Sequence, residues 1–268
     1  MGDNGRDMDP LLEIRVVHAA DAEAAEAAGA DRLLVVAVPD GSSRGSSGGW
    51  SGGWSGGMAG GVAPADAARS PEPALVSSLC RSSDIPVRVL LRLDDRETTT
   101  GAGLVRLAGL ASDYLAAGAE GLVYGFLDSD LEIDTELCAE LADRTRAPWT
   151  FSRVFDRVLD PRRAWRQVRQ LPGLDGVLTA GAALGATQGH EALLALAASD
   201  PAAARLTIAA GGVQAEHVPW LVRAGIRRLH LGTAVRLGGS WTKAHTDAAL
   251  VRSWRLLLDD ALERVRTA

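Results

Sequence analysis

The chain has 268 residues, of which 47% are hydrophobic and 23% charged, a composition typical of a globular protein and not of a disordered one. Its net charge is −6 and no block of Lys or Arg could follow a phosphate backbone, so we expect no nucleic-acid partner. No apolar run approaches the roughly 20 residues that span a bilayer, and the N-terminus has no apolar stretch of signal-peptide type, so we expect no membrane contact and a cytoplasmic location.

Short apolar segments alternate with Ala- and Leu-rich amphipathic segments after a polar leader at residues 1–10. We predict eight strands, each followed by a helix, at residues 11–17, 32–38, 86–92, 121–126, 148–153, 175–180, 205–210 and 228–233. Such alternation is typical of a parallel sheet. Because no Rossmann glycine pattern follows the first strand, a closed barrel is favoured over an open doubly wound sheet. The sequence therefore predicts one (β/α)8 TIM-barrel domain, of class α/β, over residues 11–268.

One Gly/Ser-rich segment, residues 41–61 with Trp50 and Trp54, interrupts this alternation. Its composition cannot bury enough apolar surface to offset the entropy lost on ordering. It follows the second strand, so in a barrel it lies at the C-terminal mouth, where active sites occur. Two interpretations stay open: a lid with two Trp anchors, or an insertion without a role.

Charged side chains gather near the ends of the first, third and fifth predicted strands. They are Glu13, Arg15, Arg88, Arg92, Arg153 and Asp156. Since side chains alternate along a strand and helices cover the outside of a barrel, we expect the charged residues of strands 1 and 3 to point into the lumen. Arginines outnumber carboxylates here, which predicts an electropositive site for a small anionic ligand. The alternative is a structural salt-bridge layer formed by Glu13, Arg88 and Arg92.

Glycines follow the last two predicted strands, as Gly211 and Gly212 and as Gly232 with Thr233. Barrels often bind phosphate at these places with backbone N–H groups and a helix N-terminus, although glycine is also common in tight turns. Thr179 and Gly181, after the sixth strand, would complete that side of the rim.

His230 lies within the eighth predicted strand, where it is either an acid/base group or a hydrogen-bonded core histidine. We expect His190, His217 and His245 to be solvated. Both cysteines, Cys80 and Cys138, fall in predicted helices, and no His/Cys/carboxylate spacing is typical of a metal site. The residues therefore predict no bound metal.

Eight sequence blocks occur in the order found in the CutC copper homeostasis family. They are LLEI (11–14), AGADR (28–32), GGVAP (60–64), IPVRVLLR (85–92), WTFSRVFD (149–156), GVLTAG (176–181), AAGGV (209–213) and HLGTA (230–234). The chain resembles this family along nearly its whole length. The resemblance implies a TIM barrel in the cytoplasm that often forms homo-oligomers and has a role in copper handling, with no reaction securely attached. It implies the site positions Glu13, Arg92, Arg153, Asp156, Thr179, Gly211, Gly212 and His230.

The chain departs from the family pattern at several polar positions. Arg15 and Val36 stand where the family has cysteines, Leu34 replaces a glutamate, Ser152 replaces a histidine and Asp94 replaces an arginine. Thiolate and imidazole are the ligands that suit a soft copper ion. Copper is thus the cofactor that the family implies, but the residues present do not support it.

Three hypotheses about function follow. The first is a CutC-like cytoplasmic barrel, implied to act in copper homeostasis, whose mouth binds an anionic small molecule through Arg92, Arg153 and the glycines. The alternative is a lyase or isomerase for a phosphorylated or carboxylated metabolite, with Glu13 as base and His230 or Asp156 as its partner. The third is a relative that has lost its chemistry and serves as a binding or scaffolding protein. Whether the chain is an enzyme stays open.

Overall fold

A closed parallel barrel forms the centre of the protein in the computed structural model, which describes residues 9–38, 68–241 and 244–267. The strands pair in chain order, and β1 closes the barrel by pairing with both β2 and β8. They are β1 Leu11–Val16, β2 Arg32–Val35, β3 Val87–Leu90, β4 Gly121–Tyr124, β5 Trp149–Phe151, β6 Leu174–Thr179, β7 Thr207–Ala209 and β8 Arg228–Leu231. The predicted TIM-barrel fold is confirmed. The segment at 41–61 and residues 1–8 of the leader lie outside the described residues.

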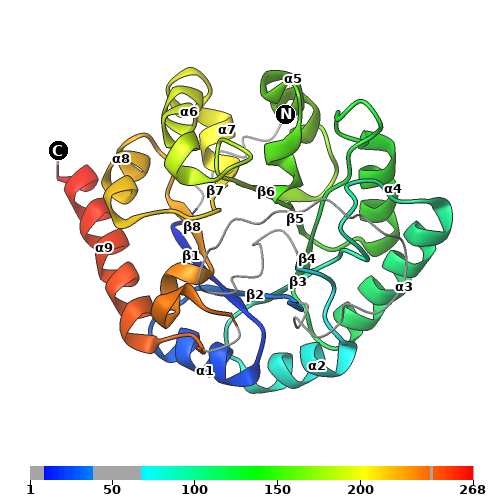
Figure 1. The fold of residues 1–268 in the computed structure, drawn as a ribbon, viewed down its shortest axis with the longest axis horizontal. Helices are drawn as coiled ribbons and strands as arrows, with labels where there is room; N and C mark the ends of the chain where they lie inside the picture. The colour runs from blue at the N-terminus through cyan, green and yellow to red at the C-terminus, as the bar shows by residue number, and fades with distance from the viewer. Residues whose placement is uncertain (1–8, 39–67, 242–243, 268) are drawn as a thin grey trace, which may run out of the picture.

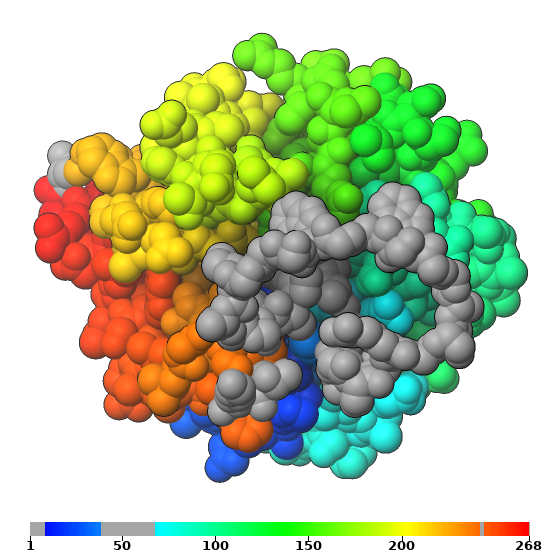
Figure 2. Space-filling view, viewed as in Figure 1, coloured from blue at the N-terminus to red at the C-terminus, as the bar shows by residue number. Residues whose placement is uncertain are grey.

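Helices surround the strands, as Figure 1 shows end-on and Figure 2 shows in space-filling form from the same side. The α-helices are α1 Ala19–Ala27, α2 Pro73–Ser82, α3 Gly101–Ala116, α4 Thr135–Thr145, α5 Pro161–Val168, α6 Ala186–Ser199, α7 Pro201–Leu206, α8 Val218–Arg223 and α9 Ala248–Arg266. Short 3-10 helices also follow strands, as η2 Arg153–Arg157, η3 Ala215–His217, η4 Thr233–Val235 and η5 Leu237–Gly239. Within the described ranges no helix is both long and apolar enough to cross a membrane.

Local sequence explains where these helices begin and end. Asp160 and Asp200 each cap a helix that starts with proline. Each side chain accepts a hydrogen bond from the backbone N–H of the third residue of its helix. The expected glycine stops are present, since Gly29, Gly118 and Gly225 have φ of 94°, 103° and 94°. These three helices therefore end at the glycines that the sequence predicts.

Several strands are shorter than predicted. β3 ends at Leu90 and not at residue 92, and β5 ends at Phe151 and not at residue 153. The chain leaves the sheet at these points because other groups satisfy its backbone: Arg92 N donates to Ser70 Oγ, and Ser152 starts η2. The mouth residues thus sit on loops that begin directly at the strand ends.

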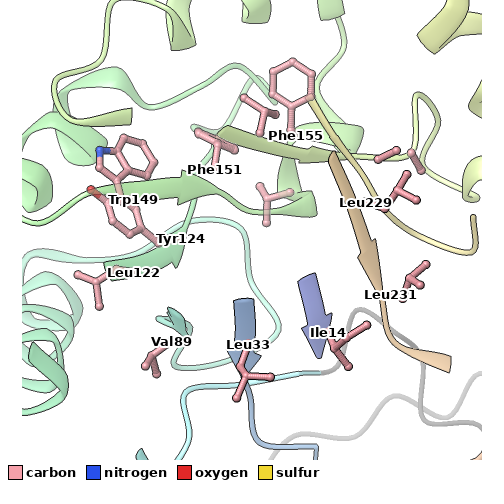
Figure 3. Packing of buried hydrophobic residues seen from close by; sticks show 14 of the residues in the cluster. Ile14, Leu33, Val89, Leu122, Tyr124, Trp149, Phe151, Phe155, Leu229 and Leu231 are labelled. Atoms are coloured by element: carbon pink, nitrogen blue, oxygen red, sulfur yellow. The ribbon is translucent and has the colours of Figure 1, made fainter. Parts of the chain in front are cut away.

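Apolar side chains fill both faces of the strands. One set lies between the strands and the helices, where Tyr124 stacks on Trp149 with ring centroids 4.1 Å apart (Figure 3). The other set fills the lumen, and includes Leu34, Leu90, Val123, Leu178 and Ile208. This inner layer closes the middle of the barrel and forms a floor for the mouth.

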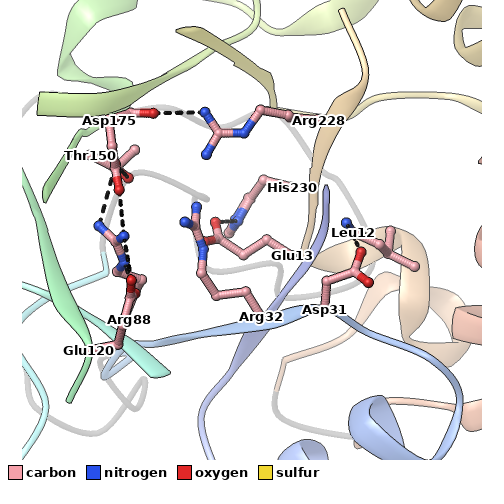
Figure 4. Close-up of polar contacts among 10 residues, drawn as sticks. All are labelled: Leu12, Glu13, Asp31, Arg32, Arg88, Glu120, Thr150, Asp175, Arg228 and His230. Carbon is pink, nitrogen blue, oxygen red and sulfur yellow. Dashed lines mark hydrogen bonds and ion pairs between the residues drawn. The ribbon is translucent and has the colours of Figure 1, made fainter. Parts of the chain in front are cut away.

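A salt-bridge layer closes the N-terminal end of the lumen (Figure 4). Arg88, which is 1% exposed, pairs with Glu120 and places Nη2 2.5 Å from Asp175 Oδ2. Arg228 Nη1 donates to the backbone oxygen of Asp175 over 2.8 Å. The expected layer of Glu13, Arg88 and Arg92 was wrong. Arg88 lies near the start of its strand, below Leu90, and its partners are Glu120, just before β4, and Asp175 of β6.

Candidate functional site

A cavity of about 530 Å³ lies at the C-terminal ends of the strands. Its walls come from the loops that follow β3, β4, β5, β7 and β8. Among the described residues that line it, six are arginines and one is an acid, Asp94. The arginines are Arg15, Arg92, Arg96, Arg106, Arg153 and Arg157. Arg96, Arg153 and Arg157 pair with Asp94, Asp156 and Glu97, and the guanidinium groups in excess of these carboxylates make the cavity electropositive.

Arg153 is the first residue of η2, directly after β5, and it lies against Gly211 in the loop after β7. A Cβ atom on Gly211 would stand 2.6 Å from Arg153 Cζ, and the φ of Gly211 is +74°. The positive φ favours glycine here, and a Cβ at this position would also displace the Arg153 guanidinium. Gly211 leaves the space that the Arg153 guanidinium occupies at the cavity wall.

Asp156 positions Arg153 from beneath. Its side chain is 1% exposed and accepts hydrogen bonds from Arg153 Nε over 3.0 Å and from Thr179 Oγ1 over 2.5 Å. Ala180 N donates to Oδ2 over 3.0 Å. Burial raises the pKa of Asp156, although the charge of Arg153 opposes this rise. Asp156 thus joins η2 to the end of β6 and does not line the cavity.

Thr179 and Gly181 belong to the same support. Gly181 N donates to Thr179 Oγ1 over 3.0 Å. A Cβ on Gly181 would meet Gly189 O of α6 at 2.3 Å, so this glycine permits close packing of loop and helix. Neither residue is among those that line the cavity. We therefore place them behind the rim.

Arg15 reaches the cavity from β1 and stacks on Trp241. Its Cζ lies 4.5 Å from the indole ring centroid, and Arg236 Cζ lies 4.2 Å from the same ring. Gly232 gives this pair room, since a Cβ there would lie 3.0 Å from Trp241 Cζ2 and 3.1 Å from Arg15 Nε. The sequence reasoning missed Trp241; a lone Trp in a loop after the last strand was the one available signal.

Arg236 is anchored to the first helix by a buried ion pair. Its Nη2 lies 2.5 Å from Asp21 Oδ2, and both side chains are 0% exposed. Asp21 also accepts from Thr246 N over 2.7 Å and from Val17 N over 3.0 Å. Burial would raise the pKa of Asp21, but these hydrogen bonds and the Arg236 charge lower it below its usual range. The loop after β8 is thereby tied to α1 and β1.

Arg92 lies just beyond β3, which is separated from the β1 strand of Arg15 only by β2. Its guanidinium donates to the backbone oxygens of Asp94 and Asp95, over 2.9 and 3.1 Å. It lines the cavity. The position of the Arg92 guanidinium is therefore fixed by the loop that contains Arg92.

Backbone amides add further donors at the edge of the cavity. Gly211 and Gly212 have φ of 74° and 86°, and Gly232 and Thr233 follow β8. Across the described ranges, none of these four N–H groups donates a hydrogen bond to another residue, and all four residues line the cavity. Short 3-10 helices, and not α-helices, follow these glycines. Amide donors of this kind bind oxyanions.

Glu13 of β1 and His230 of β8 form a buried pair (Figure 4). Glu13 is 0% exposed; its Oε1 lies 2.7 Å from His230 Nδ1, and its Oε2 accepts from Arg32 Nε over 2.6 Å. Burial alone would raise the pKa of Glu13, but the Arg32 charge and the two hydrogen bonds hold it well below its usual range. His230 lines the cavity and Glu13 does not.

The histidines outside the cavity differ from one another. His190 and His217 were both expected to be solvated. That prediction was wrong for His217, which is 7% exposed, and holds only in part for His190, which is half-buried; the two rings stack with centroids 4.7 Å apart. The short η3 turn explains this burial, because His217 Nδ1 accepts from Gln214 N within the turn. The side chain of His245 is 65% exposed, as expected.

The donor set of the described residues does not suit copper. No three His, Cys, Asp or Glu side chains in those ranges come together as metal ligands. Cys138 is fully buried in α4, where burial raises the pKa of its thiol to about 12, and Cys80 lies in α2; neither lines the cavity. Guanidinium groups, which repel a cation, stand at the mouth instead.

Comparison with protein families matches residues 61–235, more than half of the chain, to the CutC family. The mouse protein named copper homeostasis protein cutC homolog is 34% identical over 155 residues, covering 55% of this chain and 54% of the relative. A Vibrio vulnificus family protein CutC is 39% identical over 120 residues, covering 43% of this chain and 47% of the relative. The matched part thus spans about half the length of these relatives.

Solved structures support the fold. A copper homeostasis protein CutC from Streptococcus agalactiae aligns with a TM-score of 0.65 at 19% identity, covering 84% of this chain and 98% of its own. Thiamine phosphate pyrophosphorylase from Pyrococcus furiosus aligns with a TM-score of 0.53 at 12% identity, covering 94% and 97%. At these identities the likeness concerns the barrel alone.

Proposed function

The chain belongs to the CutC family, and from that premise we propose that it acts in copper homeostasis, the role that names its mouse and human relatives, while its own barrel mouth binds an anionic small molecule. The observation that carries the anion proposal is the cavity itself, where six arginines and one aspartate line the described walls. The cytoplasm is the proposed location.

The arrangement at the mouth favours an oxyanion such as phosphate or carboxylate. Guanidinium groups bind these planar or tetrahedral anions through paired, charge-assisted hydrogen bonds. Arg153 is held on one side by Asp156. Gly212 and Thr233, whose N–H groups donate to no other described residue, line the same cavity. A cavity of about 530 Å³ also falls in the range of small-molecule sites. We infer that a small phosphorylated or carboxylated metabolite is the ligand.

We propose further that the mouth holds no copper ion. The support is chemical: the described walls offer guanidinium and backbone N–H groups, whereas a soft ion needs thiolate or imidazole ligands. Any role in copper homeostasis would then be exerted through the anion or its product.

Thermal unfolding with inorganic phosphate tests anion binding. A ligand that binds only the folded state raises the melting temperature with its concentration. We expect phosphate to stabilise the unaltered protein and Arg144→Gln, whose arginine lies on the exposed face of α4 beside Glu140. Arg153→Gln should lose most of this stabilisation. Equal stabilisation of both variants would contradict the proposed site.

A second candidate function is a lyase or isomerase, and the buried Glu13–His230 pair favours it. A carboxylate that orients an imidazole at the floor of a binding cavity is a frequent arrangement for proton transfer. Solvent-deuterium exchange at carbons next to the carbonyl of phosphorylated and carboxylated compounds tests this candidate. Exchange that is lost in His230→Gln supports it, and exchange that persists there contradicts the assignment of the pair.

A further inference from the structure

His230 has one ring nitrogen bound to Glu13 and one that is open. Nδ1 lies 2.7 Å from Glu13 Oε1. Within the described ranges Nε2 has no hydrogen-bond partner, and it is not fully enclosed by protein atoms. Since His230 also lines the cavity, Nε2 faces the space where the anion is proposed to bind.

Glu13 decides which nitrogen carries the proton. Its oxygens accept from Arg32 and face His230, and the side chain is 0% exposed. An ionised carboxylate only accepts hydrogen bonds, so Nδ1 of His230 must carry the hydrogen. A neutral imidazole has one N–H group, and Nε2 is therefore left with its lone pair. The geometry thus favours His230, and not Glu13, as the group that exchanges protons with a ligand.

The surroundings of His230 favour its neutral form over the charged imidazolium. Burial lowers the pKa of His230, Glu13 on β1 opposes this, and Arg15 on β1 and Arg32 on β2 reinforce it. A dianion that binds between Nε2 and the arginines adds negative charge on the open side of the ring. Such a neighbour favours the charged imidazolium, and at close range it raises the pKa of the ring by about one pH unit or more.

We propose that His230 is the acid/base residue of the mouth, that Glu13 is its positioning residue, and that binding of a phosphate-like dianion is coupled to uptake of one proton at Nε2. This inference rests on the proposed anion site. The proton comes from solvent and binds the Nε2 lone pair, and no other bond is made or broken. The resulting Nε2–H donates to the anion, which places a proton beside the ligand.

Histidine side-chain NMR of the full chain tests the proposal, with sulfate as the probe because it stays a dianion throughout the relevant pH range. The pKa of His230 is measured without sulfate and at saturating sulfate. We expect it to rise by about one pH unit, while the pKa of His217, buried outside the cavity, does not change. His230→Gln assigns the resonance, and if that variant does not fold, single Gln variants of the other four histidines assign it by elimination.

The backbone amides of Gly212 and Thr233 separate two kinds of failure. If sulfate shifts their resonances but leaves the pKa of His230 unchanged, the coupling is wrong and the anion site stands. If no resonance at the mouth responds to sulfate, the anion site is wrong and the coupling falls with it.

Glu13→Gln tests the positioning role by a readout that a purely structural residue would not affect. Nitrogen-15 chemical shifts report which ring nitrogen carries the proton. In the unaltered protein we expect neutral His230 to carry it on Nδ1, and in Glu13→Gln we expect a mixture of the two forms with a lower pKa. A proton on Nε2 in the unaltered protein, which can be observed even if the variant fails to fold, would overturn the proposal.

Discussion

Arg153 occupies the place that a side chain on Gly211 would fill, with its Cζ 2.6 Å from the position of the missing Cβ. The two residues follow β5 and β7, so the contact joins two rim loops whose strands are separated only by β6. Glycine at 211 therefore leaves the observed position of the arginine open and also suits the positive φ of the backbone.

Gly211→Ala should be more destabilising than Gly212→Ala. Both glycines have positive φ, which costs an alanine about 1 to 2 kcal/mol. A Cβ on Gly212 meets nothing within 4 Å, whereas one on Gly211 collides with Arg153, which adds about 1 to 3 kcal/mol. Urea unfolding of the two variants measures the difference. Equal losses would mean that Arg153 moves aside freely and is not held at the wall.

Asp21→Asn should lower the free energy of unfolding by about 3 to 5 kcal/mol at pH 7, because it leaves Arg236 buried without its counter-charge. Glu140→Gln, which removes one partner of the exposed pair with Arg144, is the control and should cost at most about 0.5 kcal/mol. Similar small losses in both variants would show that the Asp21–Arg236 pair does not hold the loop.

The same aspartate predicts a pH dependence. The pKa of Asp21 lies below its unfolded value of 3.8, so the folded state favours the ionised form. Its contribution is fully present above the unfolded pKa and is lost as the pH falls toward the folded one. The unaltered protein should therefore lose more stability than Asp21→Asn between about pH 5 and pH 2. Parallel acid titrations, followed by circular dichroism, compare the two.

Cu(I) should not bind tightly to the unaltered protein under reducing conditions, since neither cysteine lies at the cavity. The double variant Arg15→Cys with Val36→Cys places thiols at two cavity-lining positions and should gain Cu(I) affinity. A competition assay with a Cu(I) chelator measures both. Stoichiometric binding by the unaltered protein that is lost in Cys80→Ser or Cys138→Ser would contradict this expectation.

The barrel could be predicted because its signals are local. Apolar segments alternate with amphipathic ones, and the glycines at 29, 118 and 225 adopt the left-handed conformation that stops each helix. The lumen-facing position of Arg88 also followed from strand alternation, but its partners did not. Glu120 precedes β4 and Asp175 lies in β6, and pairing across a closed barrel depends on registers that no local pattern reports.

The site was harder to predict for the same reason. Glu13 and Asp156 were recognisable as polar residues near strand ends, yet only the three-dimensional arrangement shows that they hold His230 and Arg153 and do not line the cavity. Trp241 carried no pattern at all, because its contact with Arg15 joins the first strand to a loop after the last. Contacts of that range are set by closure of the barrel.

The most direct measurement of the central claim is a crystal structure of the protein soaked with selenate, whose selenium can be located by anomalous scattering. We expect an anomalous peak in the mouth, with selenate oxygens within hydrogen-bond distance of the Arg153 guanidinium and the Gly212 N–H. Selenate bound only at other surfaces, with ordered water in the cavity, would contradict it.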